Sequence, residues 1–355
     1  MRLSRAQTQE RNRGKVLAAA RAEFAERGFR AAKIDDVAER AELTRGAVYS
    51  NFPGKRALYF AVLAEDAERV SLPPNPGETV REALGAFARA SVSRLPLASD
   101  DEYGQARLGV ELFPEVLADE RTRVPFAQLM RLNALLLGLA LERLEPSGRM
   151  VRVAEIALTT LAGAGQMAAA APGFVEPFGI VKACERLAEL ALNDVWLAPR
   201  LTPHVEPVNS PWSPPEAIDA VGNEHARLTG DGVVAFLGLH RLSVVEEAVR
   251  AGAEVTVVLV TSDPGELIPL ARLAIADFAS LLRHAFPRSA WPRVQVVCDE
   301  TGALAAAAGV PAVSDVTQAA VRIESGRIVL RAEGYGACEA AAARSSENLS
   351  IQDRN

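Results

Sequence analysis

A short helix with a guanidinium, a phenol and hydroxyl groups is the part of this sequence best suited to bind a nucleic acid. Thr44 is a suitable N-cap for it, because its hydroxyl accepts a hydrogen bond from the free backbone N–H groups. Val48 and Phe52 lie four residues apart and are expected to face inward. The residues that then point elsewhere are Arg45, Gly46, Tyr49 and Ser50. The major groove of DNA accepts a small exposed helix of this kind on an apolar support.

A second short helix precedes this one, and the two are expected to form a helix-turn-helix. Apolar residues recur at helical spacing from Ile34 to Ala41, so the earlier helix buries one stripe and exposes its charged residues. Gly54 breaks the chain after the pair, and Lys55 opens the next helix. A longer helix is expected ahead of the pair, from about residue 8 to Glu26, and Gly28 is placed to end it.

Positive charge is concentrated at the start of the chain. The whole chain has a net charge of −6, which alone argues against a nucleic-acid partner. From Met1 to Lys33, however, nine Lys or Arg residues stand against three Glu residues. Local positive charge favours DNA binding, because neutralising phosphates releases counterions. A solvated basic tail is the alternative, and the neighbouring helix-turn-helix favours DNA.

The run from Leu43 to Leu58, LTRGAVYSNFPGKRAL, resembles the DNA-binding domain of TetR-family transcriptional regulators. Gly28–Phe29 and Ile34 to Ala38 extend the resemblance, which covers residues 1–70. Two positions depart from the family's pattern. Glu42 stands in the turn where the family usually has glycine, and Ala32 stands where a capping threonine that touches phosphate is common. The turn must therefore form without its favoured residue.

The resemblance implies a set of DNA contacts: Lys33, Thr44, Arg45, Gly46, Tyr49, Asn51 and Lys55. Arg45 is expected to contact a base edge, since its forked guanidinium suits guanine. Thr44, Tyr49 and Asn51 are expected to hold phosphates or sugars, and Gly46 to allow close approach. Lys55 is expected to bind phosphate at a helix N-terminus. The alternatives are that Tyr49 only packs and that Lys55 is solvated.

The unit at residues 71–199 opens with a Pro-rich linker at residues 71–77. Beyond the linker the sequence has only helical patterns, which are separated by prolines. Helices are expected at Thr79 to Ser93, Asp101 to Leu112, Arg121 to Leu144, Ser147 to Ala171 and Pro177 to Trp196. The resemblance implies that this bundle binds a small apolar effector and forms a homodimer.

The helix from Arg121 to Leu144 is apolar around much of its surface and should be central to the bundle. The helices around 147–171 and 177–197 are rich in Ala, Gly and Leu, so they are the candidate dimer interface; ordinary packing within one chain is the alternative. The polar candidates for effector binding are Glu111, Gln128, Arg131 and Asn133. Each of these four could instead be a surface group.

Residues 200–229 contain many prolines and are expected to form an extended linker. Residues 230–343 alternate strands and helices and end in a hairpin whose turn is Glu324–Gly326, which predicts a small α/β sheet with parallel pairs. The expected fold is thus all-α for the N-terminal two-thirds, followed by an α/β domain and a polar tail at 344–355.

The strand order, and the stretches DETGALAAAAGV and AAVRIESGRIVLRAEG, resemble a thioredoxin or peroxiredoxin-type fold. That family has a reactive cysteine after the first long strand, at a helix N-terminus. His240 and Ser243 occupy the corresponding positions here, and Thr317 falls near the usual cis-proline. A base–nucleophile pair of His240 and Ser243 would lack an acid to orient the histidine. A domain without redox activity, kept for binding or assembly, is therefore expected.

Three cysteines, Cys184, Cys298 and Cys338, have no metal-like spacing and suit a reducing cytoplasm. No run of about twenty apolar residues predicts a membrane span, and the polar N-terminus is not a secretion signal. No catalytic residue, cofactor or metal is predicted. The prediction is a non-enzymatic, ligand-responsive repressor that binds a palindromic operator as a homodimer. The alternative is a redox-sensing regulator or thiol-redox enzyme that uses Cys298 or Cys338.

Overall fold

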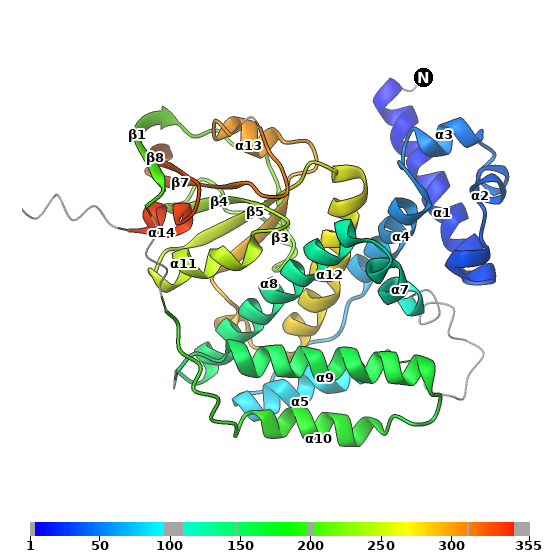
Figure 1. Cartoon of the computed structure of the whole chain (residues 1–355), viewed down its shortest axis with the longest axis horizontal. Coiled ribbons are helices and arrows are strands. Elements are labelled where there is room, and N and C mark those ends of the chain that lie inside the picture. Colours follow the sequence, from blue (N-terminus) through cyan, green and yellow to red (C-terminus); the bar gives the residue numbers. More distant parts are fainter. Residues whose placement is uncertain (1–3, 96–108, 147, 198–201, 311, 344–355) are drawn as a thin grey trace, which may run out of the picture. The chain divides into compact units, whose positions relative to one another are not determined.

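A computed structural model describes residues 4–95, 109–146, 148–197, 202–310 and 312–343 of the chain (Figure 1). The chain divides into two compact units. The helical unit consists of Met1–Val195 and Asp263–Pro292, and the α/β unit consists of Trp196–Ser262 and Arg293–Asn355. The expected boundaries differ from this division, because residues 263–292 interrupt the α/β segment and join the helices, and because the expected linker at 200–229 belongs to the α/β unit.

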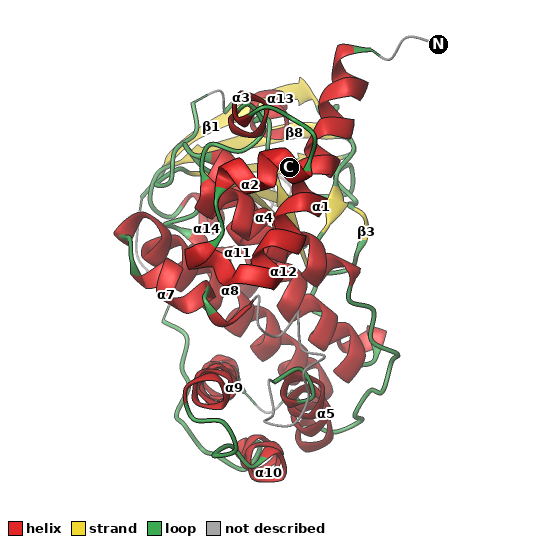
Figure 2. Ribbon diagram, turned by 90° about the vertical axis from the view of Figure 1, so that its right-hand side faces the viewer, coloured by secondary structure: helices red, strands yellow, loops and turns green. Residues whose placement is uncertain are grey.

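The helical unit begins with the helix-turn-helix region and continues as a bundle. Its helices are α1 (Arg5–Ala31), α2 (Ile34–Arg40), α3 (Arg45–Tyr49), α4 (Lys55–Arg69), α5 (Val80–Val92), α7 (Leu112–Leu117), α8 (Glu120–Leu144), α9 (Val151–Ala170), α10 (Pro177–Leu187) and α12 (Pro264–Ala285). The helical N-terminal region is therefore confirmed. The expected helix from Asp101 to Leu112 falls mainly outside the described residues. Helices α5, α9 and α10 pack side by side (Figures 1 and 2).

Aromatic rings hold α1 and α4 together beneath the helix-turn-helix. Tyr59 of α4 has no exposed surface, and its ring centroid lies 5.5 Å from that of Phe24 and 4.7 Å from that of Phe29. Gly28 interrupts α1 with a φ of 75°, so the chain turns there and brings Phe29 back against Tyr59. Gly28 therefore interrupts the helix as predicted, although α1 continues beyond it to Ala31.

Helix α12 lies in the centre of the bundle, although its sequence lies between two strands of the α/β unit. It packs along α4 and against α5 and α8. Its buried residues include Leu267, Ile268, Leu270, Leu273, Ile275, Phe278, Leu281 and Leu282. A helix that is apolar on several sides needs partners around it. The chain therefore leaves the α/β unit after Ser262, completes the helical core, and returns at Arg293.

The α/β unit contains a six-stranded mixed sheet. Its strands are β1 (His204–Pro211), β4 (Gly232–Gly238), β5 (Val255–Val260), β6 (Val294–Cys298), β7 (Gln318–Glu324) and β8 (Arg327–Glu333), in the spatial order β1-β8-β7-β4-β5-β6. Strands β4, β5 and β6 are parallel, and the other neighbouring pairs are antiparallel. The remaining elements are β2 (Ile218–Asp219), β3 (Glu224–His225), η1 (Leu242–Val244), α11 (Val245–Arg250), α13 (Ala303–Ala307) and α14 (Ala337–Ala342). An α/β unit is thus present, as expected.

The proline-rich stretch at 200–229 contributes to the sheet where a free linker is expected. Strand β1 pairs with β8 at the edge, and the register is irregular between Pro207 and Ser210. An edge strand tolerates prolines because one side of it needs no N–H donors. Trp212 follows, 4% exposed, and its indole Nε1 donates to the Leu228 carbonyl at 2.7 Å. The stretch is extended, as predicted, but it is packed.

Two helices are long and apolar enough to cross a membrane by length and composition, a test that core helices of soluble proteins also pass. They are α8, whose most apolar window is 67% buried within the protein, and α9, whose window is 33% buried. The burial of α8 agrees with its expected central place in the bundle. In the described part of the chain, no cluster of His, Cys, Asp and Glu side chains suits a metal ion.

Candidate nucleic-acid interface and bundle pocket

The turn between α2 and α3 forms around a glutamate. Glu42 has a φ of 56°, a left-handed conformation that side chains with a Cβ adopt at a cost. The turn is closed by backbone hydrogen bonds from Glu42 N to Glu39 O at 3.0 Å and from Leu43 N to Ala38 O at 3.0 Å. The strain foreseen from the absent glycine is therefore located at this residue.

Replacing Glu42 with glycine is expected to stabilise the helical unit by about 0.5–1 kcal/mol, because glycine removes the left-handed strain. The contact of Glu42 with Lys15 at 3.4 Å is exposed and contributes little. The matched control is Glu39→Gly within α2, which should destabilise by about 0.5–1 kcal/mol. Urea unfolding of the full chain measures both changes. Loss of stability in Glu42→Gly equal to that in Glu39→Gly would contradict this account of the turn.

Helix α3 exposes the predicted reading side chains on one surface. Thr44 caps the helix, with its hydroxyl accepting from Ala47 N at 3.2 Å. Arg45, Gly46 and Tyr49 are exposed, and the guanidinium carbon of Arg45 lies 5.5 Å from the Tyr49 ring centre. Interaction with Tyr49, and then with Asp35 at 3.3 Å, raises the pKa of Arg45. The Arg45 side chain is thus a permanent cation that lies over the Tyr49 ring on the exposed surface of α3.

Of the other three predicted DNA contacts, Asn51 and Lys55 form hydrogen bonds within the domain, and Lys33 is exposed. Asn51 donates from Nδ2 to Ala47 O at 2.8 Å and so closes the end of α3. Lys55 donates to Arg30 O at 3.1 Å and lies over the Phe29 ring, and partial burial lowers its pKa. Lys33 is the exposed N-cap residue of α2, without a side-chain capping hydrogen bond.

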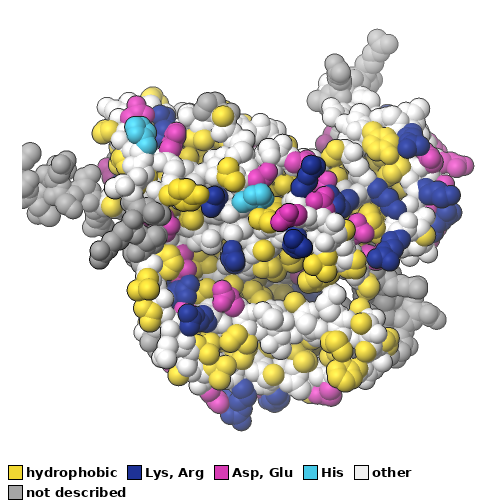
Figure 3. All heavy atoms as spheres, in the orientation of Figure 1, with side chains coloured by type: hydrophobic (Ala, Val, Ile, Leu, Met, Phe, Trp, Pro, Cys, Tyr) yellow, Lys and Arg dark blue, Asp and Glu magenta, His cyan; other side chains and the backbone are white. Residues whose placement is uncertain are grey.

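Arg13 of α1 is a residue that reasoning from the sequence missed. Its guanidinium lies 4.6 Å from the Phe52 ring centre and donates to the Asn51 carbonyl at 3.4 Å. It therefore braces the end of α3 from the basic helix α1. The run of basic residues in the first 33 positions indicates that this helix could approach DNA, but it does not reveal which arginine turns toward α3. Lys and Arg side chains in this region are interspersed with acidic ones (Figure 3).

Helix α4 connects the reading helices to the bundle. Arg56 in its first turn donates to Asp119 at 3.0 Å, ahead of α8, and also to Glu266 at the start of α12. A Cβ added to Gly265 would lie 2.9 Å from the Pro53 ring, so the α12 N-terminus closely approaches the loop after α3. Farther along, Arg272 of α12 pairs with Glu68 at 2.8 Å. Helix α12 thus contacts both ends of α4.

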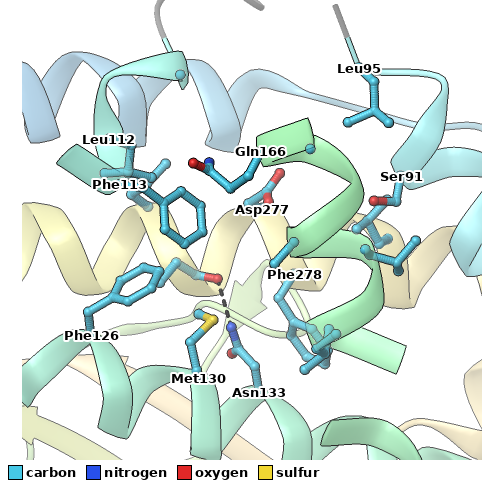
Figure 4. A pocket seen from close by; sticks show the side chains of 18 of the residues that line it. Ser91, Leu95, Leu112, Phe113, Phe126, Met130, Asn133, Gln166, Asp277 and Phe278 are labelled. Carbon is cyan, nitrogen blue, oxygen red and sulfur yellow. Dashed lines mark hydrogen bonds between the residues drawn. The ribbon is translucent and has the colours of Figure 1, made fainter. Parts of the chain in front are cut away.

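A cavity of about 300 Å³ lies within the bundle (Figure 4). Asn133 lines it, whereas the other three predicted effector residues are not among the lining residues. Glu111 accepts a hydrogen bond from Phe29 N, Gln128 is buried on α8, and Arg131 is exposed on α8.

The polar residues Ser91, Gln166 and Asp277 also line this cavity, and sequence reasoning did not select them. Asp277 belongs to α12, which the sequence assigns to another domain. The sequence indicates an effector site only within residues 71–199, and nothing in that range points to Asp277. Four phenylalanines complete much of the wall: Phe87, Phe113, Phe126 and Phe278.

The α/β unit has its thiols away from the position of a reactive cysteine. Cys338 is buried in α14, and burial raises its pKa far above the usual range. Burial also raises the pKa of Cys184 in the helical unit to about 11. Such thiols stay protonated and react slowly. His240 donates its backbone N–H to Asp315 O at 2.8 Å, and Ser243 lies in η1.

Comparisons with known proteins locate the similarity at the helix-turn-helix. Residues 16–62 match the family model of bacterial regulatory proteins of the tetR family. The HTH-type transcriptional activator FasR of Mycolicibacterium smegmatis is 36% identical over 61 residues, which are 17% of this chain and 28% of that protein. The chain thus matches less than a third of the length of this curated relative.

Solved structures with similarity include a TetR transcriptional regulator from Rhodococcus sp. RHA1, at 16% identity and a TM-score of 0.34, covering 50% of this chain and 95% of that one. The fatty acid degradation regulator FadR of Bacillus halodurans has 17% identity and a TM-score of 0.25, covering 49% and 96%. Scores of this size do not establish a common overall arrangement. The match to the family model and the geometry of α1 to α4 agree, and the N-terminal domain of this chain is a TetR-family regulatory domain.

Proposed function

We propose that the protein is a DNA-binding transcriptional regulator whose affinity for its operator responds to a small molecule in the bundle. The observation that carries this proposal is the surface of α3, where Arg45 and Tyr49 are exposed next to the Thr44 cap. A guanidinium at the start of a recognition helix can form a bidentate hydrogen bond to guanine. The TetR-family match over residues 16–62 supports the same conclusion.

Helices α9 and α10 are the proposed dimer interface. Apolar side chains on them remain accessible in the single chain, among them Ile156 at 36%, Met167 at 42% and Phe178 at 80% exposed. Small exposed residues such as Ala162 and Gly163 allow another helix to approach closely. A two-fold dimer would present two α3 helices to half-sites about one helical turn, or roughly 34–36 Å, apart.

Helix α12 is the proposed connection between ligand and DNA. It lines the cavity through residues that include Ala274, Asp277 and Phe278, and it contacts the start of α4 through Glu266. A ligand that favours one position of α12 therefore changes the position of α4 and of the reading helices. Repression with release by the ligand is the proposed direction of the response.

The α/β unit is proposed to be a thioredoxin-like domain without thiol chemistry. Parallel β4 and β5 joined through α11, followed by the β7–β8 hairpin and α14, support that assignment. The high pKa of Cys338 disfavours the redox-sensing alternative for this residue.

Selection of duplexes from a random library with the full-length protein tests the proposed function. The expected result is enrichment of an inverted repeat with half-sites one helical turn apart, because a two-fold dimer reads a two-fold site. Light scattering of the protein alone should give the mass of two chains. A folded protein that enriches no duplex would overturn the proposal.

A further inference from the structure

The charged group in the wall of the bundle cavity is a carboxylate. Among the lining residues that the structure describes, Asp277 is the one with an ionisable side chain, and the other polar ones are Ser91, Asn133 and Gln166. The Asp277 side chain is 59% accessible, and the residue is part of the cavity wall. Figure 4 shows the Asp277 carboxylate, the Gln166 amide and the Phe113 ring among the side chains that line the cavity.

The environment of Asp277 leaves its negative charge incompletely balanced. Arg94 donates to Asp277 Oδ1 at 2.8 Å and to Ser280 Oγ at 2.9 Å, from the end of α5. Although much of this side chain is accessible, the protein atoms crowded around its carboxylate displace water and raise the pKa of Asp277, and the nearby Arg94 offsets this only in part. A cationic ligand that reaches the carboxylate would therefore further stabilise its ionised form, because Arg94 alone does not balance the charge.

Aromatic rings face the same space in two pairs. Phe87 and Phe278 have ring centroids 6.0 Å apart, and Phe113 and Phe126 meet edge to face at 5.7 Å. The faces of such rings attract cations within about 6 Å. Asn133 has a further acceptor, its buried Oδ1, which has no hydrogen-bond partner while its Nδ2 donates to Ala274 O at 3.0 Å. The wall thus combines acceptors with rings.

An anionic ligand fits this wall poorly. A carboxylate in the cavity would approach the like charge of Asp277. Arg94 is not among the lining residues, and two of its nitrogens already donate to Asp277 and Ser280. A volume of about 300 Å³ suits a molecule with one ring and a short chain.

We propose that this cavity binds a lipophilic cation, an aromatic or aliphatic amine whose ammonium group contacts Asp277 and whose apolar part lies among the phenylalanines. The regulatory role of this ligand rests on the proposed function, but the binding of the amine in the cavity does not depend on DNA. Because Asp277 is on α12, the ammonium would act directly on the helix that contacts Arg56 of α4.

Three probes of matched shape test the proposal: 4-phenylbutylammonium, 4-phenylbutan-1-ol and 4-phenylbutyrate. Calorimetry with the full-length protein at pH 7.5 should show the ammonium binding about tenfold or more tighter than the carboxylate. Asp277→Asn leaves Arg94 uncompensated, so it should weaken ammonium binding about tenfold and strengthen that of the carboxylate. The control Glu120→Gln, an exposed carboxylate at the start of α8 that does not line the cavity, should change neither affinity.

A second variant covers the case in which Asp277→Asn fails to fold. Gly165 lines the cavity on α9, so Gly165→Leu should fill it and reduce binding of all three probes. Equal affinity for the ammonium and the carboxylate, or binding that survives Gly165→Leu, would overturn the proposal. Binding of the full-length protein to its selected duplex is measured separately. Specific DNA binding without any ammonium binding overturns this inference alone, whereas ammonium binding without any DNA binding overturns the proposed function alone.

Discussion

A chain cut after Arg200 is expected to lose the folded helical bundle. The cut removes α12, whose buried residues include Leu267, Ile275 and Phe278, from its contacts with α4, α5 and α8. The cut exposes the apolar side chains of α4, α5 and α8 that pack against α12, and each large one that returns to water costs about 1.5–3 kcal/mol. The sum is comparable to the roughly 5–15 kcal/mol by which a domain is stable. Circular dichroism and urea unfolding of residues 1–200 should show no cooperative transition for the bundle.

The matched control restores α12 without the sheet. Residues 1–195 joined by a long Gly/Ser linker to residues 263–292 contain the whole helical unit. This chain is expected to fold cooperatively, because every described helix of the unit is then present. A cooperative, native-like transition of residues 1–200 would contradict the assignment of α12 to the helical core.

Replacing Tyr59 with alanine is expected to destabilise the helical unit by about 3–5 kcal/mol. The ring is fully buried between Phe24, Phe29 and Phe60, so its removal leaves a cavity that helices cannot readily close. The unfolding midpoint of the full chain in urea measures this loss. A change below about 1 kcal/mol would show that these aromatic contacts do not hold the domain together.

Tyr49 supplies the matched control on the neighbouring surface. Its side chain is 42% exposed on α3, so Tyr49→Ala should change the free energy of unfolding by less than about 0.5 kcal/mol. The same change should weaken DNA binding, because the phenol is placed beside Arg45 on the reading surface. If Tyr49→Ala unfolds the domain, the main role of this tyrosine is packing within the domain and not contact with DNA.

The helix-turn-helix was predictable because its signals are local. Thr44 caps α3 through a residue three positions on, and Val48 and Phe52 turn inward at helical spacing. The strain at Glu42 was also visible, since a turn that favours glycine was occupied by a residue with a Cβ. Interactions over a few residues follow from the sequence pattern.

The sequence predicts helix α12 but not the unit to which it belongs, because its location depends on tertiary contacts. A helix between two strands is typical of a crossover that covers a sheet, and the alternating pattern around Pro264–Ala285 predicts that arrangement. Its apolar residues instead pack on α4, α5 and α8, far away in sequence. Strand β1 was missed for a related reason: its prolines indicate a linker, and only the pairing with β8 makes it part of the sheet.

The candidate effector site shows the same limit. The apolar surroundings of Asn133 predict a place beside the effector, and the structure places this residue in the cavity wall. Similar surroundings favour Glu111, but its carboxylate accepts a hydrogen bond from Phe29 N. Asp277 lies 144 positions after Asn133 in the numbering and joins it only because α12 enters the bundle. The hydrophobic periodicity of the sequence does not show that Asp277 and Asn133 line the same cavity.

The most direct test of DNA reading is fluorescence anisotropy of the full-length protein on its selected duplex, with Arg45→Ala and the control Arg69→Ala. Arg69 is an exposed arginine in the last turn of α4. The wild type should bind with a steep dependence on salt, Arg45→Ala should lose about 1–3 kcal/mol of binding free energy, and Arg69→Ala should match the wild type. Equal affinity of Arg45→Ala and wild type on that duplex would contradict α3 as the reading helix.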